Sequence, residues 1–166
     1  MGKMLTKQKQ ITGLIAWLLV VFIAAGIGAA ASVDAGPFYI HLDRPSWAPS
    51  PSIFGPVWTI LYALMGIAAW LIWRSGGFRA ARFALSLFLA QLVLNALWSW
   101  LFFGWHRGAL AFADLLVLWV LIVATCIAFW RIGSLPGALL IPYLLWVSFA
   151  CVLDYSVWQL NPRVLG

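Results

Sequence analysis

Five apolar stretches of roughly membrane-spanning length divide this chain, and they constrain its fold more than any other feature. The stretches cover 11–31, 53–73, 80–103, 109–130 and 135–153. Each is close to the about 20 residues that a helix needs to cross a bilayer. Charged and helix-breaking residues fall between them, and only one connection, 32–52, is long. The pattern predicts an all-α membrane protein, a single five-helix transmembrane bundle forming one domain over 1–166.

The composition agrees with this pattern. Hydrophobic residues make up 65% of the chain and charged residues 8%, and the mean hydropathy is +1.01. These values lie far outside the averages of soluble globular domains. Spans and short connections use almost every residue, which leaves no room for a separate soluble domain.

The distribution of positive charge predicts an orientation. The basic residues of the N-terminal tail and of the second and fourth connections are Lys3, Lys7, Lys9, Arg74, Arg79, Arg82 and Arg131, and those on the other side are Arg44, Arg107 and Arg163. By the positive-inside rule, the N-terminus faces the cytoplasm, whereas the first loop and the C-terminus lie outside. The formal net charge of +6 therefore reflects topology. We expect no nucleic-acid partner.

The first apolar stretch has a second interpretation, as a signal peptide. Three lysines precede it, and the small residues AAAS at 29–32 imitate a cleavage site. We favour a retained helix because the stretch is long enough to span. Ala24, Gly28 and Ser32 would give that helix a small-residue packing face.

Several classes of activity lack their residues in this sequence. All three lysines lie in the N-terminal tail, so no buried lysine can form a Schiff base with a chromophore. No phosphate-binding loop, GxSxG or HExxH motif is present. His41 and His106 lie in different connections without clustered carboxylates or cysteines, which gives a metal or haem site little basis. We expect no metal and no required cofactor.

Aromatic and amide side chains recur at helical spacing on three of the expected helices. The three stripes are Phe54, Trp58, Tyr62, Met65 and Ala69; Gln91, Asn95, Trp98 and Phe102; and Tyr143, Trp146, Phe149, Ala150 and Leu153. Amides inside a membrane need partners and should not face lipid. Pro142 would kink the last helix and open space between helices. Together the stripes predict a pocket for a flat, hydrophobic ligand with polar edges. The alternative is structural, with tryptophans at the membrane interface and amides joining helices.

Six segments of the chain resemble the translocator protein family, also called tryptophan-rich sensory proteins. They are PSWAP at 45–49, VWTILYALMG at 57–66, QLVLNALWS at 91–99, FFG at 102–104, PYLLW at 142–146 and WQLNP at 158–162. The resemblance covers nearly everything after the first helix and implies a bacterial member with five membrane helices, often dimeric. It implies binding of porphyrins such as protoporphyrin IX, and in some members of sterols and of benzodiazepine-type or isoquinoline drugs.

The resemblance also implies particular site residues. The positions that match the family's ligand cavity are Trp47, Trp58, Tyr62, Asn95, Trp98, Trp146, Phe149 and Ala150. Of these, Trp58 and Trp146 match tryptophans implicated in light-dependent porphyrin degradation by some bacterial members. The expected function is therefore a porphyrin-binding sensor or regulator. The alternatives are a light- and oxygen-dependent porphyrin-degrading enzyme and a porphyrin or lipid transporter.

The chain departs from the family pattern at three places. Ser50 separates two prolines that are usually adjacent, which would loosen the first loop. Asp154 stands where members commonly carry asparagine, and we expect it to be interfacial and hydrated; the alternative is a pH-sensitive partner of the pocket. After Tyr155 the first basic residue is Arg163, too distant for the weak cholesterol motif.

Small residues suggest where helices approach closely. Ala80 and Ala84, and Gly26 and Ala30, form small-xxx-small faces. The resemblance favours the first pair as the seam of a homodimer. Packing within one chain is the alternative.

Overall fold

The computed structural model of the chain describes residues 6–166. Lys3, one of the cations behind the predicted orientation, lies outside them. Ten helical segments occur in this part of the chain, and it contains no strand. The predicted all-α class is confirmed.

Five helical spans are long and apolar enough to cross a membrane, in agreement with the five predicted stretches. The spans are α1 (Lys7–Ala31), α3 (Pro51–Arg74), α5 (Arg82–Ser99) continued by the π-helical turn η1 (Trp100–Gly104), α6 (Gly108–Ile132), and α7 (Ser134–Leu139) followed by α8 (Ile141–Leu160). The last span runs seven residues beyond the expected end at Leu153. Polar side chains such as Asp154 and Gln159 lower the hydropathy there, although the helix stops only at Asn161, before Pro162.

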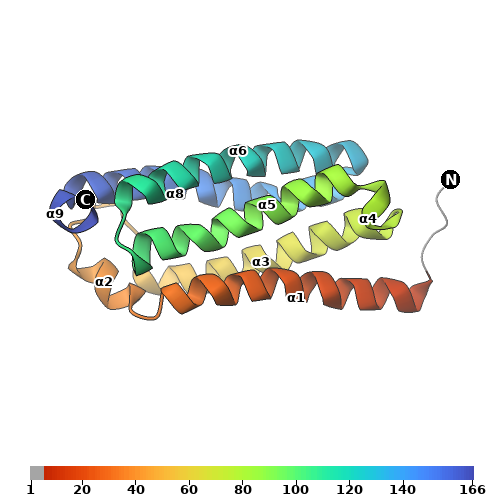
Figure 1. The fold of residues 1–166 in the computed structure, drawn as a ribbon, viewed down its shortest axis with the longest axis horizontal. Helices are drawn as coiled ribbons and strands as arrows, with labels where there is room; N and C mark the ends of the chain where they lie inside the picture. The colour runs from red at the N-terminus through yellow and green to blue at the C-terminus, as the bar shows by residue number, and fades with distance from the viewer. Residues whose placement is uncertain (1–5) are drawn as a thin grey trace.

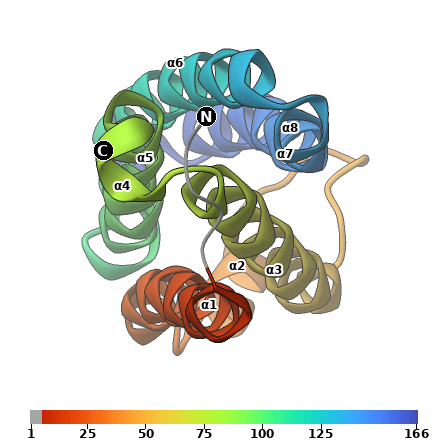
Figure 2. The same cartoon turned by 90° about the vertical axis from the view of Figure 1, so that its right-hand side faces the viewer.

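The spans form a closed ring around a common interior. Going around it, α1 packs against α3, α3 against α7 and α8, α8 against α6, α6 against α5, and α5 against α1. Figure 1 shows the long helices side by side, and Figure 2 shows the ring along its axis. The start of α1, the end of α3 and the short helix α4 (Gly77–Ala80) share one end of the bundle; α2 and the C-terminus share the other.

The interruption between α7 and α8 corresponds to the expected kink. Pro142 has no N–H to donate within the helix. The chain breaks at Leu140, whose N–H donates to the carbonyl of Gly137 at 3.2 Å in a tightened turn. The break therefore lies two residues before the proline.

The first loop is not entirely a loop. It contains the helix α2 (Ala35–His41), which the sequence did not predict. The rest of the loop is tied to the end of α8 through Asn161. The Asn161 Nδ2 donates to the carbonyls of Asp43 at 2.8 Å and Val157 at 2.7 Å. The Asn161 Oδ1 accepts from the Asp43 N–H at 2.9 Å. This clamp, next to the four-residue helix α9 (Pro162–Leu165), fixes the loop over one end of the bundle.

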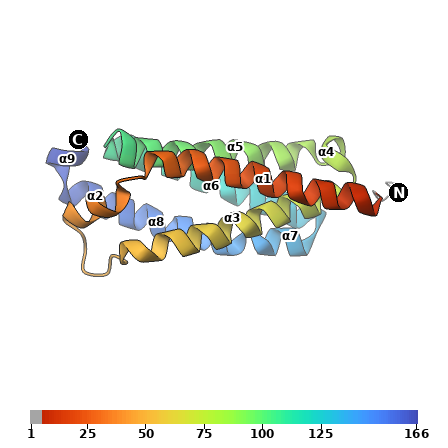
Figure 3. The ribbon, with the colours of Figure 1, turned by 90° about the horizontal axis from the view of Figure 1, so that it is seen from below.

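The opposite end of the bundle is solidly packed. Met65, Ile72, Leu85, Phe88 and Phe129 are completely buried there. Two glycines allow α1 and α3 to touch: a Cβ on Gly13 would meet the Trp73 ring at 2.1 Å, and one on Gly66 would meet Leu18 at 2.9 Å. From this contact the two helices separate toward α2 (Figure 3). We call these two ends the packed end and the hollow end.

Candidate functional site

A cavity of about 510 Å³ occupies the hollow end. Its walls are the second half of α1, the first half of α3, the end of α5 with η1, the start of α6 and the middle of α8, and α2 closes it from outside. The residues that line it are Phe22, Ala25, Gly28, Ala29, Ser32, Ala35, Gly36, Tyr39, Pro51, Phe54, Gly55, Trp58, Thr59, Tyr62, Asn95, Trp98, Ser99, Phe102, Phe103, Leu115, Leu118, Trp146, Val147, Ala150, Leu153, Asp154 and Val157. Its volume falls within the about 300–1,000 Å³ range of small-molecule sites.

Six of the eight site residues expected from the sequence lie on this cavity. They are Trp58, Tyr62, Asn95, Trp98, Trp146 and Ala150. The other two lie just behind its wall. Trp47, which is 48% exposed, meets the edge of the Phe149 ring with centroids 5.9 Å apart. Phe149 in turn contacts Trp146 at 5.6 Å, so this pair supports the wall from outside.

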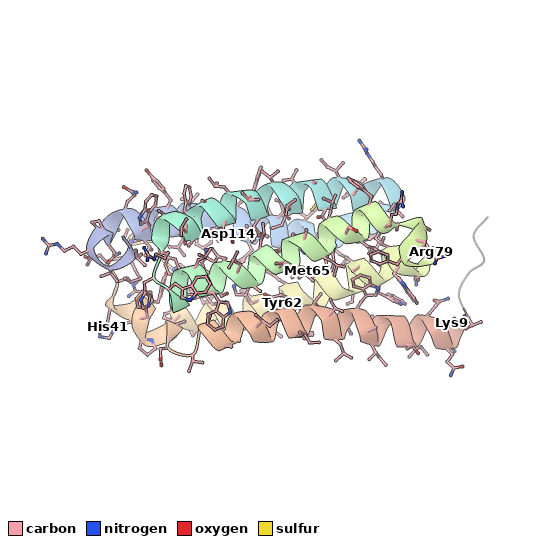
Figure 4. All side chains as sticks on the ribbon, viewed as in Figure 1. Lys9, His41, Tyr62, Met65, Arg79 and Asp114 are labelled. Carbon is pink, nitrogen blue, oxygen red and sulfur yellow. The ribbon has the colours of Figure 1, made fainter. Side chains whose placement is uncertain are left out.

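A chain of buried hydrogen bonds joins three helices at the inner boundary of the cavity. The Tyr62 hydroxyl donates to Asn95 Oδ1, and Asn95 Nδ2 donates to the Tyr143 hydroxyl at 3.1 Å. Tyr143 then donates to Gln91 Oε1 at 2.7 Å. Figure 4 shows Tyr62 and Met65 in the interior of the bundle. The two amides therefore avoid lipid, as expected, and the network fixes Asn95 at the cavity wall.

Nine aromatic residues, carried by α1, α2, α3, α5 with η1, and α8, form part of the cavity wall. Trp58 leans on Tyr62 with centroids 5.6 Å apart. Trp98 stacks on Phe102 at 5.4 Å, and Phe54 meets Trp146 at 5.9 Å. Each ring is held by another ring, so the wall is rigid before any ligand arrives.

The cavity wall contains one acidic residue, Asp154, and its placement corrects the expectation of a hydrated, interfacial side chain. Only 3% of Asp154 is exposed. Its Oδ1 accepts a hydrogen bond from Trp98 Nε1 at 3.3 Å, whereas its Oδ2 has no hydrogen-bond partner in the described structure. The expectation was wrong because α8 continues past residue 153 and carries Asp154 inside the bundle.

Tyr39 of α2 is part of the cavity lining at the hollow end. Its ring meets Phe54 edge-on at 5.5 Å, and the Arg44 guanidinium lies over its other face, 4.8 Å from the centroid. Burial raises the pKa of the Tyr39 phenol, and the positive charge of Arg44 opposes that rise. The phenol is therefore neutral at physiological pH.

Other tryptophans have the structural role that the sequence left as an alternative. Trp70 donates to the Gln10 carbonyl at 2.8 Å, Trp100 to the Ile27 carbonyl at 3.1 Å, and Trp119 to Ser148 Oγ at 2.8 Å. Each of these bonds ties two helices together. These three tryptophans are helix ties, whereas Trp58, Trp98 and Trp146 line the cavity.

Three parts of the cavity were not predicted from the sequence: the α1 wall, two leucines of α6, and Ala35, Gly36 and Tyr39 of α2. The α1 wall, from Phe22 to Ser32, belongs to a helix that is apolar on every side, so no stripe marks its inner face. Leu115 and Leu118 of α6 carry no polar signal either. In contrast, Ala24, Gly28 and Ser32 are predicted to form a packing face. Gly28 and Ser32 of that face line the cavity.

The small-residue faces behave differently from each other. Ala84 is buried by its own chain, as packing within one chain requires, whereas Ala80 is exposed. Gly26 and Ala30 lie on the outer face of α1, and a Cβ on Gly26 would meet nothing within 4 Å.

Fold and site together define a class: a five-helix membrane bundle whose hollow end encloses an aromatic small-molecule cavity. Residues 15–159 match the TspO/MBR family. The chain belongs to this family, and it is an integral membrane protein.

Curated relatives match most of the chain. It is 38% identical over 149 residues to "Protein CrtK" of Rhodobacter capsulatus, covering 86% of this chain and 91% of the relative. It is 38% identical over 149 residues to "Tryptophan-rich protein TspO" of Chlorobaculum tepidum, covering 87% of this chain and 94% of the relative. It is also 40% identical over 126 residues to the human "Translocator protein", covering 75% of each chain.

Proposed function

We propose that this protein binds a porphyrin of the protoporphyrin IX type in the cavity of the hollow end and acts as a membrane sensor or regulator. One observation carries the proposal. Indole rings from three different helices, Trp58, Trp98 and Trp146, line one cavity of about 510 Å³. A flat aromatic macrocycle is the ligand class that such walls suit, because it offers a large apolar face to each ring.

The rest of the cavity fits the same ligand. Most of its lining is apolar, and the polar groups of Asn95 and Asp154 lie on its α5 and α8 walls. A few placed polar groups in an apolar site fix a ligand's orientation. Three lining residues on α1 and α3, Phe22, Ala29 and Thr59, are also exposed on the outside of the bundle, so a membrane-dissolved ligand would reach the cavity between these two helices.

A dark titration tests the proposal. Purified protein in detergent is titrated with protoporphyrin IX, and binding is followed by the porphyrin absorbance and by tryptophan quenching. Trp146→Phe should weaken binding about two- to tenfold, the range expected for one aromatic contact. Asn95→Ala should weaken it by a similar factor, the range expected for one hydrogen bond. The matched control is Trp105→Phe, an exposed tryptophan outside the described lining, which should bind as the wild type does. Absence of saturable binding by the wild type would overturn the proposal.

A second candidate function is light-dependent porphyrin degradation. The observation that favours it is the placement of Trp58 and Trp146 on the same cavity. Trp58 contacts the ring of Tyr62, and Trp146 contacts the ring of Phe54. Molecular oxygen would be the oxidant and light the energy source. Illuminating the titrated samples and analysing them by mass spectrometry separates the two functions. New products that disappear in Trp146→Phe indicate an enzyme, and unchanged porphyrin indicates a sensor.

The proposed orientation places the hollow end away from the cytoplasm. Lys9 and Arg79 lie at the packed end, opposite His41 (Figure 4). Under the positive-inside rule, the packed end then faces the cytoplasm. Two reporter fusions at the C-terminus check this orientation. Alkaline phosphatase, which is active only outside the cytoplasm, should be active. A fluorescent protein that folds only in the cytoplasm should not fluoresce. The reverse result would invert the orientation.

We also propose a homodimer, with the exposed Gly26 and Ala30 face of α1 as the approach surface. Small residues let helix backbones approach closely in a membrane. Crosslinking through cysteines placed at these two positions, in native membranes, checks the proposal. Crosslinks formed instead from cysteines on the outer face of α6 would place the contact elsewhere.

A further inference from the structure

The polar groups on the cavity wall are not equally satisfied. Ser32 Oγ donates to the Gly28 carbonyl at 2.9 Å, and Thr59 Oγ1 donates to the Gly55 carbonyl at 2.9 Å. Tyr62 and Asn95 bond to each other. These groups are engaged with their own chain. Asp154 and Tyr39 are different, because Asp154 Oδ2 and the Tyr39 hydroxyl have no hydrogen-bond partner among the described residues. Of the two residues, Asp154 is the acidic one.

The unpartnered oxygen of Asp154 is costly where it lies. A carboxylate out of water needs hydrogen-bond donors or a cation to compensate for lost hydration. The described lining contains no lysine or arginine, and the side-chain donor that bonds to Asp154 in the described structure is Trp98 Nε1, 3.3 Å from Oδ1. Hydrogen bonds to ionised groups are usually shorter, about 2.7–2.9 Å. The empty cavity therefore leaves this carboxyl group under-coordinated.

Trp98 holds one oxygen of the carboxyl group. Its ring is stacked on Phe102 with an interplanar angle of 17°, and it meets Phe103 edge-on at 5.6 Å. Oδ2 is covered by neighbouring atoms in the described structure. Because Asp154 belongs to the cavity lining, a turn of the carboxyl group toward the cavity brings Oδ2 to a group bound there.

We propose that Asp154 makes the cavity selective for ligands that carry a hydrogen-bond donor, above all a cationic amine, on the edge facing α8. This selectivity rests on the proposed ligand function of the same cavity. The donor satisfies Oδ2, and a ligand carboxylate at the same edge is repelled. An acidic porphyrin must therefore bind with its propionates turned away from α8.

Three porphyrins with one macrocycle and different side-chain charge test this selectivity. They are protoporphyrin IX, its neutral dimethyl ester, and the dicationic derivative in which both propionates are converted to aminoethyl amides. Dissociation constants are measured in the dark for the wild type and for Asp154→Asn, which keeps the size of the side chain. A hydrogen-bonded charge pair predicts about a tenfold or greater loss of dication affinity in Asp154→Asn. Affinity for the ester should change less than about twofold, and the diacid should bind more tightly.

The matched control is Asp114→Asn. Asp114 is a half-buried carboxyl group on α6 that is absent from the described cavity lining. If it lowers dication affinity as much as Asp154→Asn does, general negative charge attracts the dication and the proposal is wrong. Equal dication affinity in wild type and Asp154→Asn overturns it as well. Unchanged ester binding shows that the cavity has kept its shape.

A second pair of probes separates this proposal from the porphyrin function. The pair is 1-naphthylmethylamine and 1-methylnaphthalene, which share an aromatic body and differ in the amine. If the three porphyrins fail to bind but the amine binds the wild type at least tenfold better than Asp154→Asn, the porphyrin function fails and the Asp154 proposal holds. If neither the dicationic porphyrin nor the naphthyl amine responds to Asp154→Asn, the Asp154 proposal fails.

Discussion

The packed end and the hollow end of the bundle are built from the same five helices, yet they differ in what fills the space between them. At the packed end, Met65, Ile72 and Phe88 are completely buried and glycines bring α1 and α3 together. At the hollow end the same two helices separate, and aromatic rings line an open cavity. The hollow end still has a buried cluster of its own, which includes Phe102, Val157 and Leu165. The comparison therefore teaches that one end is packed throughout, whereas the other is packed around a cavity.

The largest effect should come from removing a ring at the packed end. Phe88→Ala leaves a void among side chains that include Trp17 and Phe129, and we expect it to destabilise the protein by about 3–5 kcal/mol. Phe54→Ala, at the cavity wall, should cost clearly less because that ring already borders empty space. Unfolding midpoints in detergent check the difference. Equal losses for the two variants would contradict the division into two ends.

Filling the cavity should separate binding from stability. Ala150→Phe places a ring in the space that the ligand needs, and we expect at least a hundredfold loss of protoporphyrin IX affinity. The unfolding midpoint should hardly move, because the cavity has room for the new side chain. A titration and a thermal melt of one preparation give both quantities. Retained affinity with an intact fold would show that the ligand binds elsewhere.

The hydrogen-bond network lies at the junction of the two ends, and breaking it should have a moderate effect. Tyr143→Phe removes the donor to Gln91 and the acceptor for Asn95, leaving two buried amide groups without a partner. The expected cost is about 1–3 kcal/mol. Gln91→Leu combined with Tyr143→Phe should recover part of the loss, since one orphaned group is then gone. Further loss in the double variant would argue against the network as drawn.

The smallest effects should come from glycines, and they should differ in sign. Gly66→Ala forces a methyl group against Leu18 and Val21, so we expect a loss of about 1–3 kcal/mol. In a single chain, Gly26→Ala adds a methyl group in open space on α1 and should stabilise the monomer by about 0.5–1 kcal/mol, whereas in the proposed homodimer that methyl group lies at the seam and should weaken association. Both follow from unfolding midpoints in detergent. A loss of stability in Gly26→Ala that depends on protein concentration would place this glycine in the proposed dimer contact.

Much of this division could be predicted from the sequence, for identifiable physical reasons. Membrane spans are visible because apolar length is a property of the chain itself, and the stripe of Trp58 and Tyr62 is visible because helical spacing is regular. The α1 wall could not be predicted, since a uniformly apolar helix does not reveal its inner face. Nor could the burial of Asp154, because its own polarity suggested that the span had ended before it. The helix α2 is short, and Gly36 and Pro37 in its first turn disguise it as loop.

The most direct test of the central claim compares the tryptophans of the two ends in one experiment. Protein labelled with 5-fluorotryptophan is titrated with protoporphyrin IX in the dark and followed by fluorine NMR, with resonances assigned by single Trp→Phe variants. The account predicts large ring-current shifts for Trp58, Trp98 and Trp146 at the hollow end. It predicts little change for Trp17, Trp70 and Trp73 at the packed end. Shifts confined to the packed end, or to the exposed Trp105 and Trp130, would contradict it.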